Sequence, residues 1–367
     1  MRNLCDSGCR MLKPRQAIQS LKEYHPPLGD RVGLRLDFNE NTVGASPRVL
    51  RRLQQLTLED LARYAQREPV EALVAVSLGL KPDEVLLTNG VDEAIHLLCE
   101  TYLEPSDEAI IVVPTFAMYE ISAAATGARV VRIPANQDFS FPHEAVLRAI
   151  SPLTRLIAIA NPNNPTGTLV SAESLLQIVN AAPQAAVLLD EAYYEFCGQT
   201  LLASVRNHAN VFVARTFSKA YGMAGLRVGV IAGPKDQMRM VRRVASPYNV
   251  NIAALIALTE ALQDKEYVCQ YVGQVQRGRE LLQQEFQKHD IPFCASQANF
   301  VLAKIGAAHA AFVTKMKQHE ILVRDRSTDP GCDGWVRITL GSEAHTQQLL
   351  AALRQVLSQL PIEKGVV

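Results

Sequence analysis

Short apolar runs alternate with stretches of helical periodicity through the middle of this 367-residue chain. The helical stretches include residues 91–103 and 119–125. Strands that are apolar along their whole length are typical of a mostly parallel sheet covered by helices on both faces. The pattern therefore predicts an α/β fold whose large domain has a seven-stranded, mostly parallel sheet. The seven runs, rich in β-branched residues, lie at 85–88, 109–113, 129–133, 156–160, 186–189, 211–214 and 228–232.

The rest of the chain predicts a smaller α+β domain. Long helices at 251–289, in which Gly278 is the one obvious weak point, are expected to connect the two parts. The first 50 residues, with a helix at 15–23 and an extended piece at 34–38, are expected to join the small domain. Strands are expected at 300–303, 321–323 and 335–340, and helices at 308–318 and 343–360. The expected division is an N-terminal segment at 1–50, a large domain at 51–250, linking helices at 251–290 and a small C-terminal domain at 291–367.

Composition narrows the class of protein. Lys+Arg and Asp+Glu balance at 37 each, which gives no basic surface for nucleic acid. No apolar run has the length of a membrane span, and Met1 to Ser7 lack the apolar core of a signal peptide. The seven cysteines are scattered, and the close pair Cys5 and Cys9 has no second pair to complete a zinc site. We expect a cytoplasmic protein with reduced thiols, several of them buried, and neither nucleic-acid nor membrane partners.

The segment from Thr216 to Arg227 carries the strongest chemical signal. It places Lys219 after a buried strand, in a loop where Gly222 and Gly225 allow close approach of the chain. A lysine becomes a nucleophile toward carbonyls when its surroundings let it lose a proton and hold it still. A Ser-Lys pair by itself is more often a solvated surface lysine, so the context of the segment decides.

Two upstream segments give that context. Asn164 lies in Asn161–Gly167, and Asp190 ends a strand with Tyr193 three residues later. Each has an ordinary explanation: a turn for Asn-Pro-Thr-Gly, a helix N-cap for the aspartate, and core packing for the tyrosine. Those explanations do not predict the joint order of amide, carboxylate, phenol and lysine. In that order the chain resembles the aminotransferases of fold type I, which use pyridoxal phosphate.

The resemblance implies a role for each of these residues. Lys219 would form the Schiff base with pyridoxal 5'-phosphate and later move the substrate α-proton. Asp190 would face the pyridine nitrogen and keep it protonated, with a low pKa supported by the cationic ring. Tyr193 and Asn164 would hydrogen-bond the phenolic oxygen of the cofactor.

A strand, a glycine and a helix start follow one another at Thr88–Ile95. The backbone N–H groups of Gly90, Val91 and Asp92 suit an anion, although any strand-to-helix turn can carry a glycine. Thr216, Ser218 and Arg227 would add hydroxyl groups and a bidentate cation for the cofactor phosphate. Neither Gly-x-Gly-x-x-Gly nor a Gly-Lys-Ser/Thr loop occurs here, which disfavours dinucleotide and ATP sites.

Two aromatic residues complete the expected cofactor site. Phe116 would stack on the pyridine ring, where the family usually has tyrosine, although core packing explains it equally well. The pair Arg63-Tyr64 looks like the family pair whose tyrosine reaches the cofactor phosphate of the neighbouring subunit. Tyr64 would then require a homodimer with shared sites, while an ordinary surface tyrosine is the alternative.

Segments at 21–26, 36–41 and 321–341 narrow the resemblance to histidinol-phosphate aminotransferases. By that resemblance, Arg337 would bind the α-carboxylate of glutamate. Arg324 and Tyr24 would hold the substrate phosphate, and Asn39 would belong to the same substrate site. Arg326 is interpreted as a solvated loop charge. The chain departs from the family at Thr42 and Val43, where proline and an aromatic residue are usual.

The implied reaction is transamination between L-histidinol phosphate and 2-oxoglutarate, giving imidazole-acetol phosphate and L-glutamate. Alternatives on the same fold are a threonine-phosphate decarboxylase and an aromatic amino acid aminotransferase. A cofactor-sensing regulator would need a DNA-binding segment ahead of the fold, for which the residues before Leu36 are too few. A non-catalytic interaction protein would not explain why Asn164, Asp190, Tyr193, Lys219 and Arg227 occur together.

Overall fold

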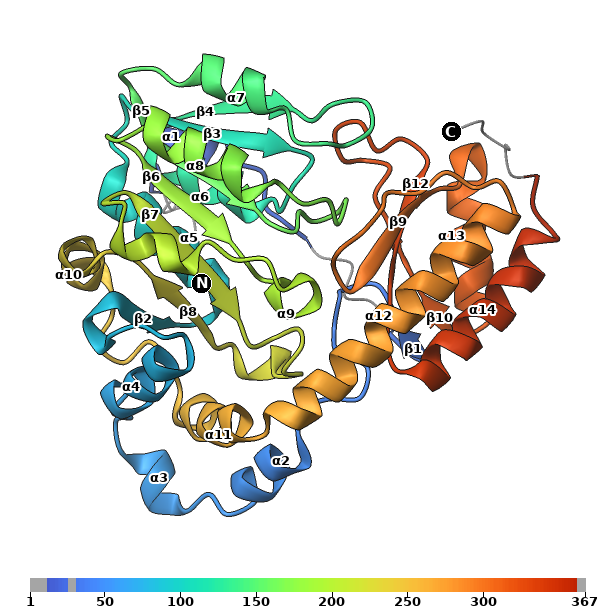
Figure 1. Cartoon of the computed structure of the whole chain (residues 1–367), viewed down its shortest axis with the longest axis horizontal. Helices are drawn as coiled ribbons and strands as arrows, with labels where there is room; N and C mark the ends of the chain where they lie inside the picture. The colour runs from blue at the N-terminus through green and yellow to red at the C-terminus, as the bar shows by residue number, and fades with distance from the viewer. Residues whose placement is uncertain (1–11, 26–30, 362–367) are drawn as a thin grey trace, which may run out of the picture.

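The computed structural model describes residues 12–25 and 31–361, which form a larger body around one sheet and a smaller body beside it (Figure 1). The larger sheet has the strand order β2-β8-β7-β6-β5-β3-β4. Only β8 runs antiparallel to its neighbours β2 and β7, and the other neighbouring pairs are parallel. The predicted seven-stranded, mostly parallel sheet is confirmed. Its strands are β2 (Val85–Thr88), β3 (Glu108–Val113), β4 (Arg129–Pro134), β5 (Thr154–Ala160), β6 (Ala186–Asp190), β7 (Val211–Thr216) and β8 (Gly229–Ala232).

Helices cover both faces of this sheet, as uniformly apolar strands require. Along β6, Leu188 belongs to one hydrophobic core, whereas Val187 and Leu189 belong to the core on the opposite face. The first face packs on α5 (Gly90–Tyr102), α6 (Met118–Thr126) and α10 (Lys235–Val244). The second face packs on α4 (Glu68–Ser77), α7 (His143–Ala149), α8 (Ala172–Ala181) and α11 (Ile252–Gln263).

The smaller body has its own core. An antiparallel sheet of order β11-β12-β9 packs against three helices, and Arg324 of β11 lies directly opposite Arg337 of β12. The longest helix, α12 (Lys265–Lys288), runs from the larger body into the smaller one (Figure 1). The other elements are β9 (Phe300–Lys304), β11 (Arg324–Asp325), β12 (Trp335–Thr339), α13 (His309–Gln318) and α14 (Glu343–Leu357).

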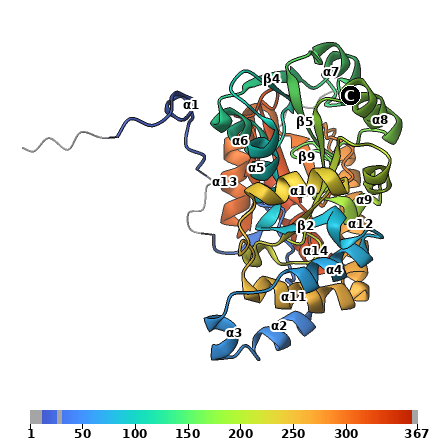
Figure 2. The same ribbon diagram turned by 90° about the vertical axis from the view of Figure 1, so that its left-hand side faces the viewer.

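The N-terminal segment contacts both bodies. β1 (Leu34–Arg35) pairs with β10 (Ile321–Leu322) of the smaller body, α2 (Pro47–Leu53) packs on α11, and α3 (Leu58–Ala62) follows it. α1 (Gln16–Gln19) lies beside α6 at the edge of the molecule (Figure 2). The helix predicted at 15–23 is therefore shorter than expected. It buries none of its residues, and so short a helix gains little without tertiary packing.

Several short elements complete the fold. Of the extended piece predicted at 34–38, only residues 34–35 form a strand, although the Leu36 N–H still donates to the Leu322 carbonyl. The chain turns at Asn39, whose φ is +55°. The short helical turns are α9 (Tyr194–Cys197), η1 (Pro82–Glu84), η2 (Leu202–Arg206), η3 (Ala224–Leu226) and η4 (Gly306–Ala308). Among the described residues, no helix combines the length and apolar character needed to cross a bilayer.

The thiol expectation can be checked for five of the seven cysteines. Those that lie among the described residues are free, and Cys99, Cys294 and Cys332 are buried. Cys5 and Cys9 lie outside the described residues.

Candidate active site

A cavity of about 650 Å³ opens at the carboxyl ends of the parallel strands, where the two bodies meet. Parallel strands bring their carboxyl ends to one edge of the sheet, so residues that follow different strands meet there. Gly90 and Tyr64 are the predicted site residues that do not line this cavity. Those that line it are Tyr24, Asn39, Val91, Asp92, Phe116, Asn164, Asp190, Tyr193, Thr216, Ser218, Lys219, Arg227, Arg324 and Arg337.

Lys219 follows β7 in a tightly closed loop. The Ser218 N–H donates to Thr216 Oγ1 at 3.1 Å, and a side chain at Gly222 would overlap the backbone of Gly44. Lys219 Nζ opens onto the cavity and donates to the Phe38 carbonyl at 3.0 Å. Burial, helped by the positive charge of Arg337, lowers the pKa of Lys219 to about 8. The amine can therefore lose its proton near neutral pH, as a nucleophile and proton carrier requires.

Asp190 is the last residue of β6 and is buried. Its carboxylate accepts a 2.5 Å hydrogen bond from the Tyr119 hydroxyl and a 3.0 Å bond from the Ala192 N–H. Burial raises the pKa of Asp190 to about 6, and no described side chain forms an ion pair with it. The low pKa expected beside a cationic ring is thus not a property of the protein alone. The carboxylate is placed to favour a cation in the cavity.

The amide side chains of Asn39 and Asn164 orient Tyr193 and Arg337 in the cavity. Asn39 Nδ2 donates to the Tyr193 hydroxyl at 2.9 Å, and Asn39 is itself held by Thr339. Asn164 Oδ1 accepts from Arg337 Nη1 at 2.5 Å, which turns the Asn164 side-chain N–H groups to other partners. Burial raises the pKa of Tyr193, so its hydroxyl keeps its proton at neutral pH.

The start of α5 and Arg227 form an anion cradle. Gly90 has φ +72°, and a Cβ there would lie 2.5 Å from Arg227 Nη2. Arg227 donates to Asp92 at 2.8 Å, which holds the guanidinium across the first turn of the helix. Ser218 Oγ is buried and finds no hydrogen-bond partner within residues 12–25 and 31–361. The N–H groups of a first helical turn have no partner within the helix, so hydroxyl, guanidinium and helix end together suit a phosphate.

Three arginines of the smaller body face the cavity from the other side: Arg324, Arg326 and Arg337. Burial and the charges of the other two lower the pKa of Arg337 to about 9, and burial lowers that of Arg324. Arg324 Nη1 and Arg337 Nε are buried and have no hydrogen-bond partner among the residues that the structure describes. Such closely spaced cations with free donors favour an anionic ligand.

The interpretation of Arg326 as a solvated loop charge is wrong. Its side chain is 13% exposed, lines the cavity and forms an ion pair with Asp329. The segment between β11 and β12 folds back over the cavity, because the Arg326 N–H donates to the Trp335 carbonyl. This antiparallel pairing could not be read from the local sequence.

The predicted aromatic residues fall into two groups. Phe116 lines the cavity and meets Tyr119 edge-on at 5.8 Å, while Tyr24 lies at the rim with 45% exposure. Tyr64 does not line this cavity, is 79% exposed and stacks on Tyr248 with ring centroids 4.2 Å apart.

The departure at Thr42 and Val43 leaves the turn intact. Asn41 Oδ1 accepts from the N–H groups of Val43 and Gly44 at 2.9 and 3.0 Å, which closes the turn without proline. Thr42 Oγ1 accepts from the Ser342 N–H and ties the turn to the smaller body.

Among the cavity residues that were not predicted from the sequence, Tyr119, Arg31 and Glu40 make polar contacts that shape the site. The Tyr119 hydroxyl donates a hydrogen bond to Asp190, but its position near the start of a predicted helix is typical of a core residue. Arg31 donates to Asp37 at 2.7 Å and to Glu40 at 3.0 Å, which places a second acid, Glu40, on the cavity wall. The Asn-Glu-Asn segment was the only available signal for Glu40, and no local signal marks Arg31.

These observations fit pyridoxal phosphate. In the described part of the chain, the cavity offers a desolvated amine, a buried carboxylate without a cationic partner, and an anion cradle with an unpartnered hydroxyl. Lys219 would hold the aldehyde carbon, Asp190 the ring nitrogen, and the Gly90 turn with Ser218 and Arg227 the phosphate.

Comparison with known proteins agrees with this chemistry. A family model described as aminotransferase class I and II matches residues 31–353. The fold, the cavity and this match define the chain as a pyridoxal-phosphate-dependent aminotransferase.

Comparison with individual relatives identifies the family within this class of aminotransferases. The histidinol-phosphate aminotransferase of Moorella thermoacetica is 33% identical over 94% of this chain and 93% of its own length. The chain belongs to the histidinol-phosphate aminotransferase family.

Solved structures share the fold. The histidinol-phosphate aminotransferase of Sinorhizobium meliloti in complex with pyridoxal-5'-phosphate has a TM-score of 0.85 and 25% identity, over 95% of this chain and 98% of that one. An L-threonine-O-3-phosphate decarboxylase from Porphyromonas gingivalis, 24% identical over 89% of this chain and 99% of that one, has a TM-score of 0.77 and shows the fold alone.

We predict that Lys219→Met stabilises the cofactor-free protein by up to about 3 kcal/mol at pH 7. A lysine whose pKa is lowered from 10.5 to about 8 in the fold destabilises the folded state fully below pH 8. That cost disappears as pH rises through the unfolded value near 10.4, because the unfolded chain then also loses the proton. Urea unfolding of both proteins between pH 7 and 11 measures this. An advantage for the variant that does not shrink above pH 8 would contradict the assigned environment of the amine.

Proposed function

We propose that the protein transaminates L-histidinol phosphate with 2-oxoglutarate in histidine biosynthesis. The observation that carries the proposal is the pair of anion sites at the two ends of one cavity. The anion cradle at the start of α5 would take the cofactor phosphate, and the three arginines of the smaller body remain for a second anion. Its curated relatives, named histidinol-phosphate aminotransferases, support this substrate over other amines.

Different residues of the cavity have different roles in the proposed reaction. Bound pyridoxal phosphate supplies an electron sink for the pair released when the substrate α-proton leaves. Lys219 Nζ, with its pKa near 8, takes that proton and returns it. Asp190 would keep a proton on the ring nitrogen of the bound cofactor, and Tyr119 orients the Asp190 carboxylate. Tyr193 and Asn164 would hold the phenolic oxygen, and Phe116 would lie against the ring.

The substrate is held by the arginines. Arg337, fixed by Asn164 and by the Asp37 carbonyl at 2.6 Å, binds the α-carboxylate of glutamate. Arg324 and Tyr24 bind the phosphate of histidinol phosphate, and Arg326 adds a third cation to that surface. A guanidinium fork accepts either phosphate or carboxylate, so one set of residues can serve both half-reactions.

We also propose that the protein works as a homodimer in the cytoplasm. Tyr64 cannot serve its own cavity, because it is exposed and stacks on Tyr248 outside the lining. Its assigned role requires the site of a second copy. The five described free thiols fit a reducing compartment.

The expected result of a half-reaction titration is a change in the cofactor spectrum with L-histidinol phosphate at micromolar to millimolar concentration. The same change should follow L-glutamate, with 2-oxoglutarate as the product. Threonine phosphate with release of CO₂ would favour the decarboxylase, and phenylalanine as the best amine would favour the aromatic enzyme. Lys219→Ala serves as the control and should lose both the covalent cofactor absorbance and turnover while keeping its fold. Turnover retained in that variant would contradict the role of Lys219.

A complementation experiment tests the shared sites. Lys219→Ala and Tyr64→Ala homodimers are each impaired, the first in the amine and the second in binding of the cofactor phosphate. Mixed dimers should recover one working site, which combines Lys219 of one copy with Tyr64 of the other. Mixing by reversible dissociation, followed by an activity assay, gives the result. A mixture that shows only the sum of the two parent activities would remove Tyr64 from the neighbouring site.

A further inference from the structure

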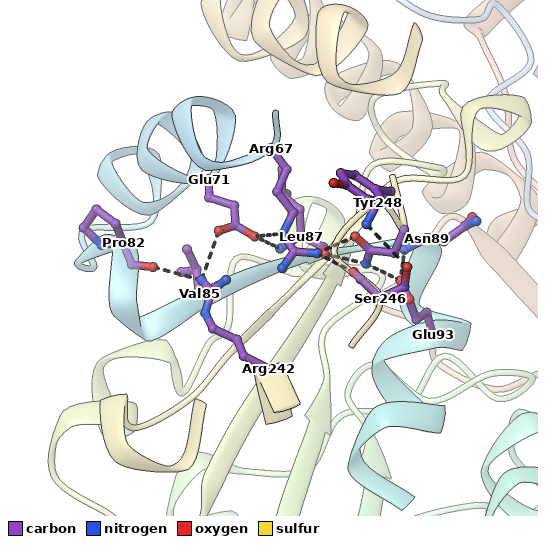
Figure 3. Close-up of polar contacts among 11 residues, drawn as sticks. Arg67, Glu71, Pro82, Val85, Leu87, Asn89, Glu93, Arg242, Ser246 and Tyr248 are labelled. Atoms are coloured by element: carbon purple, nitrogen blue, oxygen red, sulfur yellow. Dashed lines mark hydrogen bonds and ion pairs between the residues drawn. The ribbon is translucent and has the colours of Figure 1, made fainter. Parts of the chain in front are cut away.

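A polar network that includes Arg67, Glu71 and Glu93 lies against the turn before α5 (Figure 3), and none of these three residues lines the cavity. Two of its charged members, Arg67 and Glu71, are nearly closed to solvent, with relative exposures of 8% and 3%. A buried ion pair of this kind is weak evidence for stability, since desolvation offsets its attraction. The geometry of its contacts points to what else it does.

The network ends on the turn that begins α5. The Asn89 N–H donates to Glu93 Oε2 at 2.5 Å, and Asn249 Nδ2 donates to the same oxygen at 2.7 Å. Asn249 Nδ2 also donates to the Leu87 carbonyl at the end of β2, at 3.0 Å. Glu93 thus holds the N–H just before Gly90. Glu93 and Asn249 do not line the cavity, whereas Val91 and Asp92 of the same helix start do.

Arg67 fixes the direction of the Asn249 amide. Arg67 Nη1 donates to Asn249 Oδ1 at 2.7 Å and to the Ser246 carbonyl at 2.8 Å. Because the oxygen of Asn249 faces Arg67, its N–H groups face Glu93 and Leu87. Arg67 Nε pairs with Glu71 at 3.1 Å, and Glu71 also accepts from the Leu87 N–H. Backbone groups therefore hold both ends of this chain of contacts: the Leu87 N–H holds Glu71, and the Leu87 carbonyl holds Asn249.

The same network holds the exposed tyrosine pair. Tyr64 lies three residues before Arg67, and Tyr248 immediately precedes Asn249. The rings of Tyr64 and Tyr248 stack on each other. Arg67 bridges the two backbone segments that carry them.

We propose that Glu93 and Asn249, oriented by Arg67, are positioning residues for the cofactor phosphate. They shape the Gly90 turn of their own site, and the same bonds hold the Tyr64 segment assigned to the site of the second copy. The inference rests on the proposed function, because it requires pyridoxal phosphate as the ligand. It adds that phosphate affinity depends on residues that do not line the cavity.

The test compares pyridoxal phosphate with pyridoxal, which lacks the phosphate, as ligands of cofactor-free protein. Asn249→Asp keeps the oxygen for Arg67, removes both N–H donors and places a carboxylate beside Glu93. Glu93→Ala removes the anchor, and Glu93→Gln keeps one acceptor oxygen. We expect Asn249→Asp and Glu93→Ala to raise the Kd of pyridoxal phosphate about tenfold, the effect of losing one ordinary hydrogen bond. The Kd of pyridoxal should stay unchanged, and Glu93→Gln should recover most of the loss.

Glu84→Ala is the matched control. Glu84 is 8% exposed, accepts the Lys81 N–H at 2.6 Å and pairs with Arg206 at 2.9 Å, in the same body but away from the Gly90 turn. It should lower the melting temperature without changing the ratio of the two Kd values. If the Asn249 and Glu93 variants leave the ratio of the pyridoxal phosphate Kd to the pyridoxal Kd unchanged, the positioning role is overturned. Equal losses of affinity for both ligands would give that result. Wild-type protein that binds neither ligand would overturn the proposed function itself.

Discussion

The rest of this structure depends on two titratable groups that are buried at the ends of neighbouring strands. Asp190 ends β6 with its pKa raised to about 6, and Lys219 follows β7 with its pKa lowered to about 8. Both shifts are caused mainly by burial, and both disfavour the charged form. A buried charged group without a partner of opposite charge lowers the free energy of unfolding. Two separate hydrophobic cores, one on each side of the cavity, supply the stability that tolerates them. A ligand with a cationic nitrogen, a carbonyl carbon and a phosphate would provide the missing partners.

Much of this arrangement could be predicted from the sequence because the sheet is parallel. Apolar runs located the seven strands, and polar residues after parallel strands must meet at one edge. That rule brings Asn164, Asp190 and Lys219 together without any knowledge of loops. Their roles come from the family resemblance. The structure contributes their environment: Asn164 oriented by Arg337, and Asp190 hydrogen-bonded to Tyr119.

Other features depend on contacts between distant segments and left no local signal. Arg326 looked like a loop charge until the pairing of β11 with β12 folded its segment over the cavity. Tyr119 has the pattern of a core residue, and only its register on α6 aims its hydroxyl at Asp190. The bond from Arg67 to Asn249 spans 182 positions along the chain. The helix predicted at 15–23 had suitable residues but no surface to bury, so it forms a single turn.

Thermal unfolding of Asp190→Asn, with and without pyridoxal phosphate, is the most direct test of a buried carboxylate that awaits a cationic partner. The amide keeps the shape and can still bond Tyr119 and the Ala192 N–H, but it carries no charge to bury. The cofactor-free variant should melt at or above the wild-type temperature, and pyridoxal phosphate should raise its melting temperature much less than that of the wild type. A cofactor-free variant that melts below the wild type, together with an undiminished rise on adding pyridoxal phosphate, would contradict the account.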